Sequence, residues 1–240
     1  MITLYRDICC VEFIGNENII VKSYADDAKE SSHKFAFDRI FSPKDPQSEI
    51  YDYIGKPIVE SRYIMLILLG VLEGFNGTIF AYGQTGSGKT YTMSGELDNP
   101  DLEGLIPRII RNIFDYIGTT PSEIEFTVKI SMLEIYMEKI KDLIDPSRVN
   151  LNVREDKTKG IYIENLSEFY ISTEDEVLAY LKLGNEARSI SSTNMNDTSS
   201  RSHSIVIITI HQNNVADLLA KTGKLYLVDL AGSEKISKTG

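Results

Sequence analysis

The segment 78–90, TIFAYGQTGSGKT, constrains the fold of this chain more than any other. Its apolar first half is typical of a buried strand, and from Gly83 onward it reads G-x-x-x-x-G-K-[ST]. A strand that runs into this pattern is typical of a phosphate-binding loop, because the glycines let several backbone N–H groups converge on one oxyanion. The helix expected to follow adds the positive end of its dipole. The alternative is a glycine-rich turn with an incidental lysine, which the preceding strand disfavours. We therefore expect a site for a nucleoside triphosphate.

Side chains at the end of this loop and in a later strand have distinct expected roles. Lys89 is expected to reach the β and γ phosphates, and Thr90 to offer its hydroxyl to Mg²⁺. Further along, the apolar strand 225–228 ends in Asp229. A carboxylate at that position would hold the Mg²⁺ shell through water. Many strands end in Asp at a turn, so this signal is weak by itself.

Two more features suit a site that responds to the γ-phosphate. Gly232 could place a backbone N–H on that phosphate, and Glu234 is a nearby carboxylate. The loop 196–203, NDTSSRSH, gathers hydroxyl groups around Arg201. One interpretation is a solvated serine-rich loop that caps a helix. The other is a switch loop whose hydroxyls meet Mg²⁺ and the attacking water, while Arg201 pairs with a carboxylate on closure.

Composition narrows the class of protein. A chain of 240 residues with 42% hydrophobic and 25% charged residues is long enough for one substantial α/β domain. The net charge of -10 argues against sequence-independent binding to nucleic acid or to an anionic membrane. The longest apolar stretch, 63–72, is about half of what a bilayer-spanning helix needs. Cys9 and Cys10 are neighbours, which favours a reducing compartment, and no secretory signal is evident. We expect a cytosolic protein.

Periodicity predicts the order of elements. Strands are expected at 18–21, 35–41, 126–132, 205–210 and 225–228, with a hairpin between 151–154 and 161–163. A polar loop is expected at 25–33. The segment 126–132 has one polar face, which suggests antiparallel pairing, and 205–210 is apolar throughout, as in a central strand.

Three helices are also expected. Asp45 would cap the first, with Pro46 at its first position and one face formed by Ile50, Ile54 and Ile58. Pro57 should kink or divide this helix. Pro107 opens the second, whose apolar stripe is Ile106, Ile109, Ile110, Ile113 and Ile117. Thr173 and Glu176 form a capping box for the third, with buried Val177, Leu178, Leu181 and Leu183, before a polar loop at 189–203.

At this point the residues carry a family resemblance. GQTGSGKT at 83–90, NDTSSRSH at 196–203 and DLAGSE at 229–234 resemble the phosphate loop, switch I and switch II of kinesin motor domains, in that order. Flanking segments agree, and GKLYLVDLAGSEKISKTG at 223–240 is especially similar to the conventional kinesin heavy chain. The resemblance covers about 33–240. It implies the kinesin motor fold, an α/β P-loop NTPase with a mixed sheet, largely parallel at its core, and helices on both faces. It also implies one motor domain over 1–240 that is incomplete at both ends.

The resemblance also implies residue roles. The phosphate loop would bind the triphosphate of ATP through Gly83, Gln84, Thr85, Gly86, Ser87, Gly88, Lys89 and Thr90. Tyr91 would stack on adenine. Ser200 would join Thr90 at Mg²⁺, with Asp229 bound through water, and Ser199 would position the attacking water. Gly232 would sense the γ-phosphate, and Arg201 would pair with Glu234 to close the site.

The same resemblance implies a partner and a location. A motor ATPase of this family works on microtubules in the cytoplasm and cytoskeleton, as a dimer in the full-length protein, with ATP and Mg²⁺ as its cofactors. The family's main microtubule-binding elements would lie beyond residue 240, which leaves a secondary loop near Lys157 and Lys159. The net charge of -10 also opposes the acidic tubulin surface. We therefore expect this chain alone to bind microtubules weakly or not at all.

Two departures from the family pattern stand out. The first ten residues contain Arg6 but no Arg-x-Arg-Pro run, so the base pocket lacks one of its usual walls. Residues 61–70 form an apolar insertion where relatives run on directly. We hypothesise that this insertion comes from a retained intron or from an error in the gene model.

Two other functions are open to a chain with these loops. One is a non-catalytic nucleotide-binding or partner-binding module that has lost motor output. The other is an unrelated P-loop GTPase or small-molecule kinase, which the absence of an Asn-Lys-x-Asp motif disfavours. An ATPase assay with and without microtubules separates the first of these from a motor.

Overall fold

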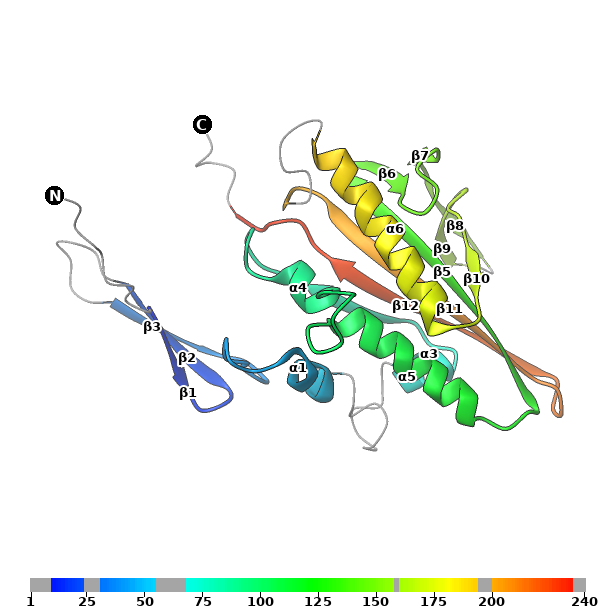
Figure 1. Cartoon of the computed structure of the whole chain (residues 1–240), viewed down its shortest axis with the longest axis horizontal. Coiled ribbons are helices and arrows are strands. Elements are labelled where there is room, and N and C mark those ends of the chain that lie inside the picture. Colours follow the sequence, from blue (N-terminus) through cyan, green and yellow to red (C-terminus); the bar gives the residue numbers. More distant parts are fainter. Residues whose placement is uncertain (1–9, 24–30, 55–67, 158–159, 194–199, 235–240) are drawn as a thin grey trace. The chain divides into compact units, whose positions relative to one another are not determined.

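The computed structural model describes residues 10–23, 31–54, 68–157, 160–193 and 200–234. The chain divides into two compact units, Met1–Pro46 and Gln47–Gly240. Each unit has its own sheet (Figure 1), and we describe them separately.

The first unit contains an antiparallel sheet of β1 (Val11–Ile14), β2 (Asn18–Ser23) and β3 (Ser31–Ala36). The strand predicted at 18–21 is confirmed. The strand predicted at 35–41 is wrong, because β3 ends at Ala36. The backbone N–H groups of Phe37 and Ile40 instead donate to carbonyls in the turn between β1 and β2. The predicted loop at 25–33 is also too long, since pairing with β2 draws residues 31–33 into β3; residues 25–30 lie outside the described part.

The second unit is built on a mixed sheet. In the described residues its strand order is β4 (Gly77–Ala81), β12 (Leu219–Asp229), β11 (His203–Asn214), β5 (Ile124–Tyr136), β6 (Lys139–Asp142) and β7 (Val149–Leu151), with β10 (Phe169–Ile171) also paired to β5. The predictions of an antiparallel strand at 126–132 and a central strand at 205–210 are confirmed. A separate hairpin joins β8 (Val153–Asp156) and β9 (Gly160–Ile163). It is close to the predicted one.

The expected parallel core is wrong for the described strands, because β4 and β12 are their only parallel pair. Short connections join β5 to β6 and β11 to β12, and such connections permit only antiparallel pairing. Hydrophobic runs show that a strand is buried but not which way its neighbour runs.

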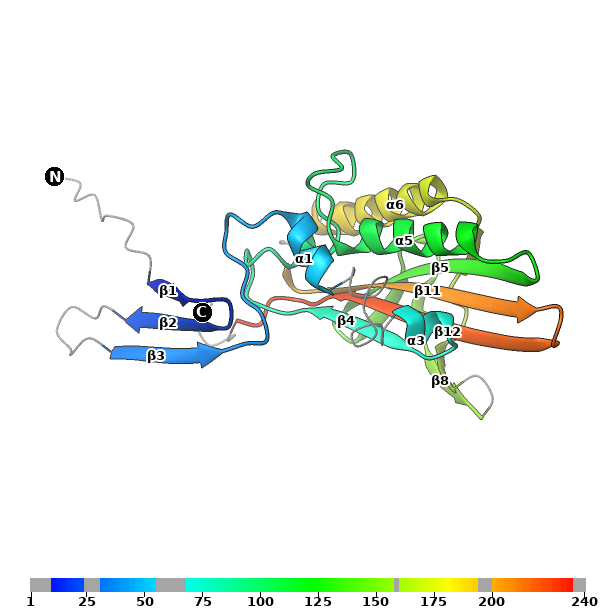
Figure 2. The ribbon, with the colours of Figure 1, turned by 90° about the horizontal axis from the view of Figure 1, so that it is seen from below.

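The described helices are α1 (Gln47–Ile54), α3 (Leu68–Leu72), α4 (Lys89–Met93), α5 (Leu105–Thr119) and α6 (Glu174–Thr193). Helices α5 and α6 lie on the same side of the sheet (Figure 2). The predicted stripe of α5 is confirmed, since Ile106, Ile109, Ile110 and Ile113 are all buried. Helix α1 is confirmed but begins at Gln47, one residue after the predicted first position at Pro46. The Asp45 carboxylate accepts hydrogen bonds from Ser42 and does not cap the helix.

Helix α6 departs from its prediction in two ways. Its buried stripe includes Val177, Leu181 and Arg188, so Leu183 points outward and is 43% exposed. The helix also continues to Thr193, into the segment predicted as a polar loop. At its start the Glu176 N–H donates to Thr173 Oγ1, as predicted. The Glu176 carboxylate accepts from the N–H of Ser172, one residue before the position that a capping box uses.

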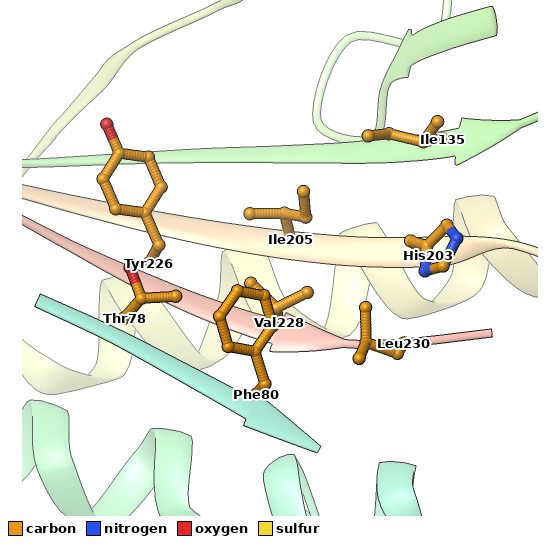
Figure 3. A pocket seen from close by; sticks show the side chains of 8 residues that line it. All are labelled: Thr78, Phe80, Ile135, His203, Ile205, Tyr226, Val228 and Leu230. Atoms are coloured by element: carbon orange, nitrogen blue, oxygen red, sulfur yellow. The ribbon is translucent and has the colours of Figure 1, made fainter. Parts of the chain in front are cut away.

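One hydrophobic core lies between these helices and the sheet. Side chains of α3, α4, α5 and α6 pack there against Val206, Ile208, Leu225 and Leu227. The intervening residues of the same strands point to the opposite face. There Phe80, Ile205, Tyr226 and Val228 help to line an open apolar pocket (Figure 3). Every described helix that enters the core therefore lies on one face of the sheet, and helices on the opposite face stay a prediction.

The insertion is described only at its end. Residues 61–67, together with Pro57 and Ile58, lie outside the described part, and residues 68–70 begin α3. Within the part of the chain that the structure describes, no helix is both long and apolar enough to cross a membrane.

Candidate functional site

The glycine-rich segment forms a compact loop between β4 and α4. Gly86 and Gly88 have φ angles of 77° and 86°, which favour glycine. A side chain at Gly83 would come within 2.5 Å of the Ser87 hydroxyl oxygen. Lys89 folds back and donates from Nζ to the carbonyls of Gly83 and Gln84, at 3.0 and 2.8 Å. The ammonium group therefore lies next to the loop that is predicted to bind the phosphates.

The parallel pairing of β4 and β12 brings a second predicted residue to this loop. Asp229 is in register with Ala81, so both strands end at the same edge of the sheet. There Thr90 Oγ1 donates to Asp229 Oδ2 at 2.7 Å. The other carboxylate oxygen, Oδ1, is buried and has no hydrogen-bond partner among the described residues. Sequence reasoning placed both residues at one metal site, and the structure brings them together.

Arg188 is a third member of this cluster, and sequence reasoning missed it. From the buried stripe of α6 its Nη1 donates to Asp229 Oδ2 at 2.7 Å, and its Nη2 donates to the carbonyl of Ser202 at 3.0 Å. Glu134 lies 4.0 Å from Arg188 Nε. A usable signal was present, because Arg188 follows Leu181 at seven residues and so lies on the apolar face of the helix.

The segment after β12 is held by four successive backbone N–H groups. Leu230 donates to the carbonyl of Ala81 at 3.2 Å, and Ala231 to Nδ1 of His203 at 3.1 Å. Gly232 donates to the carbonyl of Ser200 at 2.8 Å, and Ser233 to that of Gly83 at 3.1 Å. Loops from β4, β11 and β12 therefore meet at one place, and each of them carries predicted site residues.

Glu234 lies against the phosphate loop. Its carboxylate accepts from the hydroxyl and the backbone N–H of Thr85, at 2.5 and 2.9 Å. Hydrogen bonds from Thr85 and the nearby positive charge of Lys89 lower the pKa of Glu234 below its ordinary value. A side chain on Gly232 would meet the side-chain oxygens of both Glu234 and Thr85 at 2.4 Å, so those side chains would have to shift to admit it.

The pair of Arg201 with Glu234, which is predicted to form when the site closes, is not present among the described residues. Arg201 is exposed and has no ion pair among the described residues, while Thr85 occupies both carboxylate oxygens. The N–H of Gly232, predicted to sense a phosphate, is donated to Ser200.

The remaining predicted residues have simpler positions. Ser199 lies outside the described part, and Ser200 is half-buried at the end of the loop that precedes β11. The Tyr91 ring is about half exposed, and its backbone carbonyl accepts a hydrogen bond from buried Gln47. Sequence reasoning did not single out Gln47.

This fold and site define a class of protein, a P-loop nucleotide-binding domain in which two further loops meet the phosphate loop. The model of the kinesin motor domain family matches residues 6–240. The chain belongs to this family. Membership implies that it binds a nucleotide.

Individual relatives agree with the family match. The chain is 52% identical to a kinesin heavy chain of Syncephalastrum racemosum, over 88% of this chain and 22% of that protein. It is 44% identical to the human kinesin-1 heavy chain, over 95% of this chain and 22% of that protein. The chain thus spans about a fifth of the length of these relatives.

A solved structure is also similar. A fast kinesin, described with implications for its ATPase mechanism and its interactions with microtubules, superimposes with a TM-score of 0.84 at 47% identity. The match covers 96% of this chain and 62% of that one. The sequence-based prediction of a mixed-sheet kinesin motor fold is confirmed.

Proposed function

We propose that this chain is part of a microtubule motor ATPase, in which Mg²⁺-ATP hydrolysis is controlled by the three loops that meet at Asp229. The observation that carries the proposal is the convergence of Thr90, Arg188 and Asp229 beside the phosphate loop. We also propose that both compact units belong to one motor domain, with residues 61–70 as an insertion. In the full-length protein this domain would work in the cytoplasm, on the cytoskeleton, as a dimer.

The residues present fit Mg²⁺ and a triphosphate. Asp229 Oδ1 and Ser202 Oγ are buried polar atoms without hydrogen-bond partners among the described residues, as expected beside a hydrated cation. Thr90, Ser200 and Asp229 would hold the Mg²⁺, with Asp229 acting through water. Bound Mg²⁺ would neutralise charge on the phosphate oxygens.

The chain's own groups provide orientation and charge. Lys89 can exchange the carbonyls of Gly83 and Gln84 for phosphate oxygens, because the ammonium gains a stronger, charge-assisted partner. The N–H of Gly232, in segment 230–233, can exchange the carbonyl of Ser200 for a phosphate oxygen. Glu234 would leave Thr85 and pair with Arg201, which closes the loop around the nucleotide. Ser199 would then orient the attacking water, and Tyr91 would stack on adenine.

This mechanism depends on positioning rather than on a reactive side chain. In the structure Glu234 and Lys89 are both hydrogen-bonded to the phosphate loop itself. Closure therefore replaces hydrogen bonds within the loops with bonds to the ligand. The order in which these bonds are exchanged determines when the site closes.

Removal of the Lys89 charge tests the proposed function. Lys89→Ala should reduce steady-state ATP turnover by about a hundredfold or more, because the β and γ phosphates lose their charged partner. Turnover is measured by phosphate release at saturating Mg²⁺-ATP, with and without microtubules.

Lys182→Ala is the matched control. Lys182 is half exposed and pairs with Asp98 at the surface. The control therefore also removes one positive charge, but at a position away from the phosphate loop. Its turnover should match that of the unmodified chain. Nucleotide binding without any turnover in the unmodified chain would instead favour a non-catalytic binding module.

A further inference from the structure

Helix α4 has a carbonyl that its own short span leaves without an intrahelical partner. The helix covers only Lys89–Met93 and turns away at Gly95, whose φ is 63°. In a longer α-helix the N–H of residue 95 would bind the carbonyl of Tyr91. Here it donates to the carbonyl of Thr90, at 3.3 Å. The Tyr91 carbonyl is therefore free to accept from elsewhere.

Gln47 supplies that hydrogen bond from a different helix. Its side-chain amide donates from Nε2 to the Tyr91 carbonyl at 2.5 Å. Gln47 is only 4% exposed, and its Oε1 is buried with no hydrogen-bond partner among the described residues. The donating side chain is thus buried, and losing the donor removes this partner from the Tyr91 carbonyl.

The helix that carries Gln47 is itself anchored. Ile50, Tyr51 and Ile54 of α1 pack against the hydrophobic core, and α1 lies on α5. Burial raises the pKa of the Tyr51 phenol, which agrees with this packing. Gln47 is the first residue of α1, and it therefore holds α4 from a helix that is itself packed against the core.

Neighbouring residues of α4 are held by different groups. At the phosphate end, Lys89 donates to the loop carbonyls and Thr90 donates to Asp229. At Tyr91, the side-chain hydrogen bond in the described residues comes from Gln47. A change at Gln47 should therefore affect the base end of the site more than the phosphate end.

We propose that Gln47 is a positioning residue that fixes Tyr91, and with it the aromatic wall for the nucleotide base. This inference rests on the proposed function, since it assigns the base to Tyr91. The proposal makes affinity for the base depend on a residue of α1, which lies outside the three phosphate-sensing loops.

Binding of ADP and of pyrophosphate to the Gln47→Met variant tests the proposal. Methionine has a similar length and no donor. Affinity for ADP, measured by calorimetry at fixed Mg²⁺, should fall about three- to tenfold, the usual effect of one lost hydrogen bond. Affinity for pyrophosphate should stay within about twofold, because Lys89 and Thr90 keep their partners.

Two further variants separate positioning from general loosening. Ile50→Val trims the contact of α1 with the core and leaves Gln47 in place, so the ratio of the two affinities should not change. In a Tyr91→Ala background, Gln47→Met should no longer alter that ratio, because the ring through which it acts is gone. Thermal unfolding of every variant checks that the chain is folded.

The outcomes are distinct. Equal losses for ADP and pyrophosphate, no loss for either, or a selective loss that persists with Tyr91→Ala would each overturn the assignment of Gln47. Failure of the unmodified chain to bind ADP or pyrophosphate would overturn the proposed function instead.

Discussion

At the scale of single residues, the site is organised by competition for a few hydrogen-bonding groups. Asp229 Oδ2 accepts from both Thr90 and Arg188, which leaves Oδ1 for water or a cation. Glu234 occupies the hydroxyl and the backbone N–H of Thr85, where an anion could otherwise bind. These contacts hold the loops together, and in the proposed mechanism Glu234 leaves Thr85 when the site closes.

The contact between Glu234 and Thr85 gives a pH prediction. Because the pKa of Glu234 is lowered in the folded chain, the contact contributes fully above the ordinary carboxyl pKa and is lost as the pH falls through the lowered value. Thr85→Val removes the hydroxyl donor, so the pKa of Glu234 should rise toward its ordinary value. Carbon-13 NMR of the Glu234 side chain, followed against pH, measures this change.

Asp145 is an internal reference in the same spectra. The hydroxyl of Ser147 and the guanidinium of Arg148 lower the pKa of its carboxyl, and neither group touches Thr85. Its titration should not move. An unchanged midpoint for Glu234 in the Thr85→Val chain would mean that the contact is not formed in solution.

At the scale of elements, helix α6 links the hydrophobic core to the site. Its inner face carries Val177 and Leu181 and then, two turns after Leu181, the guanidinium of Arg188. The stripe that packs the helix against the core therefore also places a positive charge beside Asp229, at the C-terminal end of the helix. A shift of α6 would be felt at the carboxylate that the proposed Mg²⁺ shell needs.

The orientation of α6 predicts very different effects for two leucines that are two residues apart. Leu181 is 1% exposed and Leu183 is 43% exposed. Leu181→Ala should reduce the free energy of unfolding by about 2–5 kcal/mol, because it leaves a cavity in the core. Leu183→Ala should change it by about 0.5 kcal/mol or less.

Urea denaturation followed by circular dichroism measures both variants. The unmodified chain is the common reference, and the slope of unfolding free energy against urea should be the same for all three. Similar losses for the two variants would show that the helix is rotated from the orientation described.

At the scale of the whole molecule, charge and family membership pull in different directions. The chain belongs to a family of motor domains, yet it carries a net charge of -10. A microtubule surface is acidic, so long-range electrostatics oppose the encounter. Any binding by this chain has to overcome that repulsion through a local basic contact.

We therefore predict weak or no co-sedimentation of this 240-residue chain with microtubules at low ionic strength. The assay compares pelleted fractions with ADP, with a non-hydrolysed ATP analogue and without nucleotide. Added salt should not reduce what little binding there is, because it screens repulsion as well as attraction. Nucleotide-dependent binding at micromolar affinity would contradict the prediction.

Much of the fold could be predicted because it depends on patterns among residues that are close together in the sequence. The α5 stripe, the apolar strand of β11 and the loop from Gly83 to Thr90 depend on residues close together in sequence. The inner and outer residues of α6 were harder, because four leucine and valine positions fit more than one helical face. Only packing against the sheet chose between Leu181 and Leu183.

The sequence by itself determined that a strand, a glycine-rich loop and a lysine–threonine pair form a phosphate site, since that depends on neighbouring residues. It also determined the order of the three loops. The tertiary structure alone decided which groups meet: Arg188 with Asp229, Glu234 with Thr85 and Gln47 with Tyr91. These pairs are separated by 41 to 149 residues, and their contact depends on strand direction and helix rotation, which local composition does not encode.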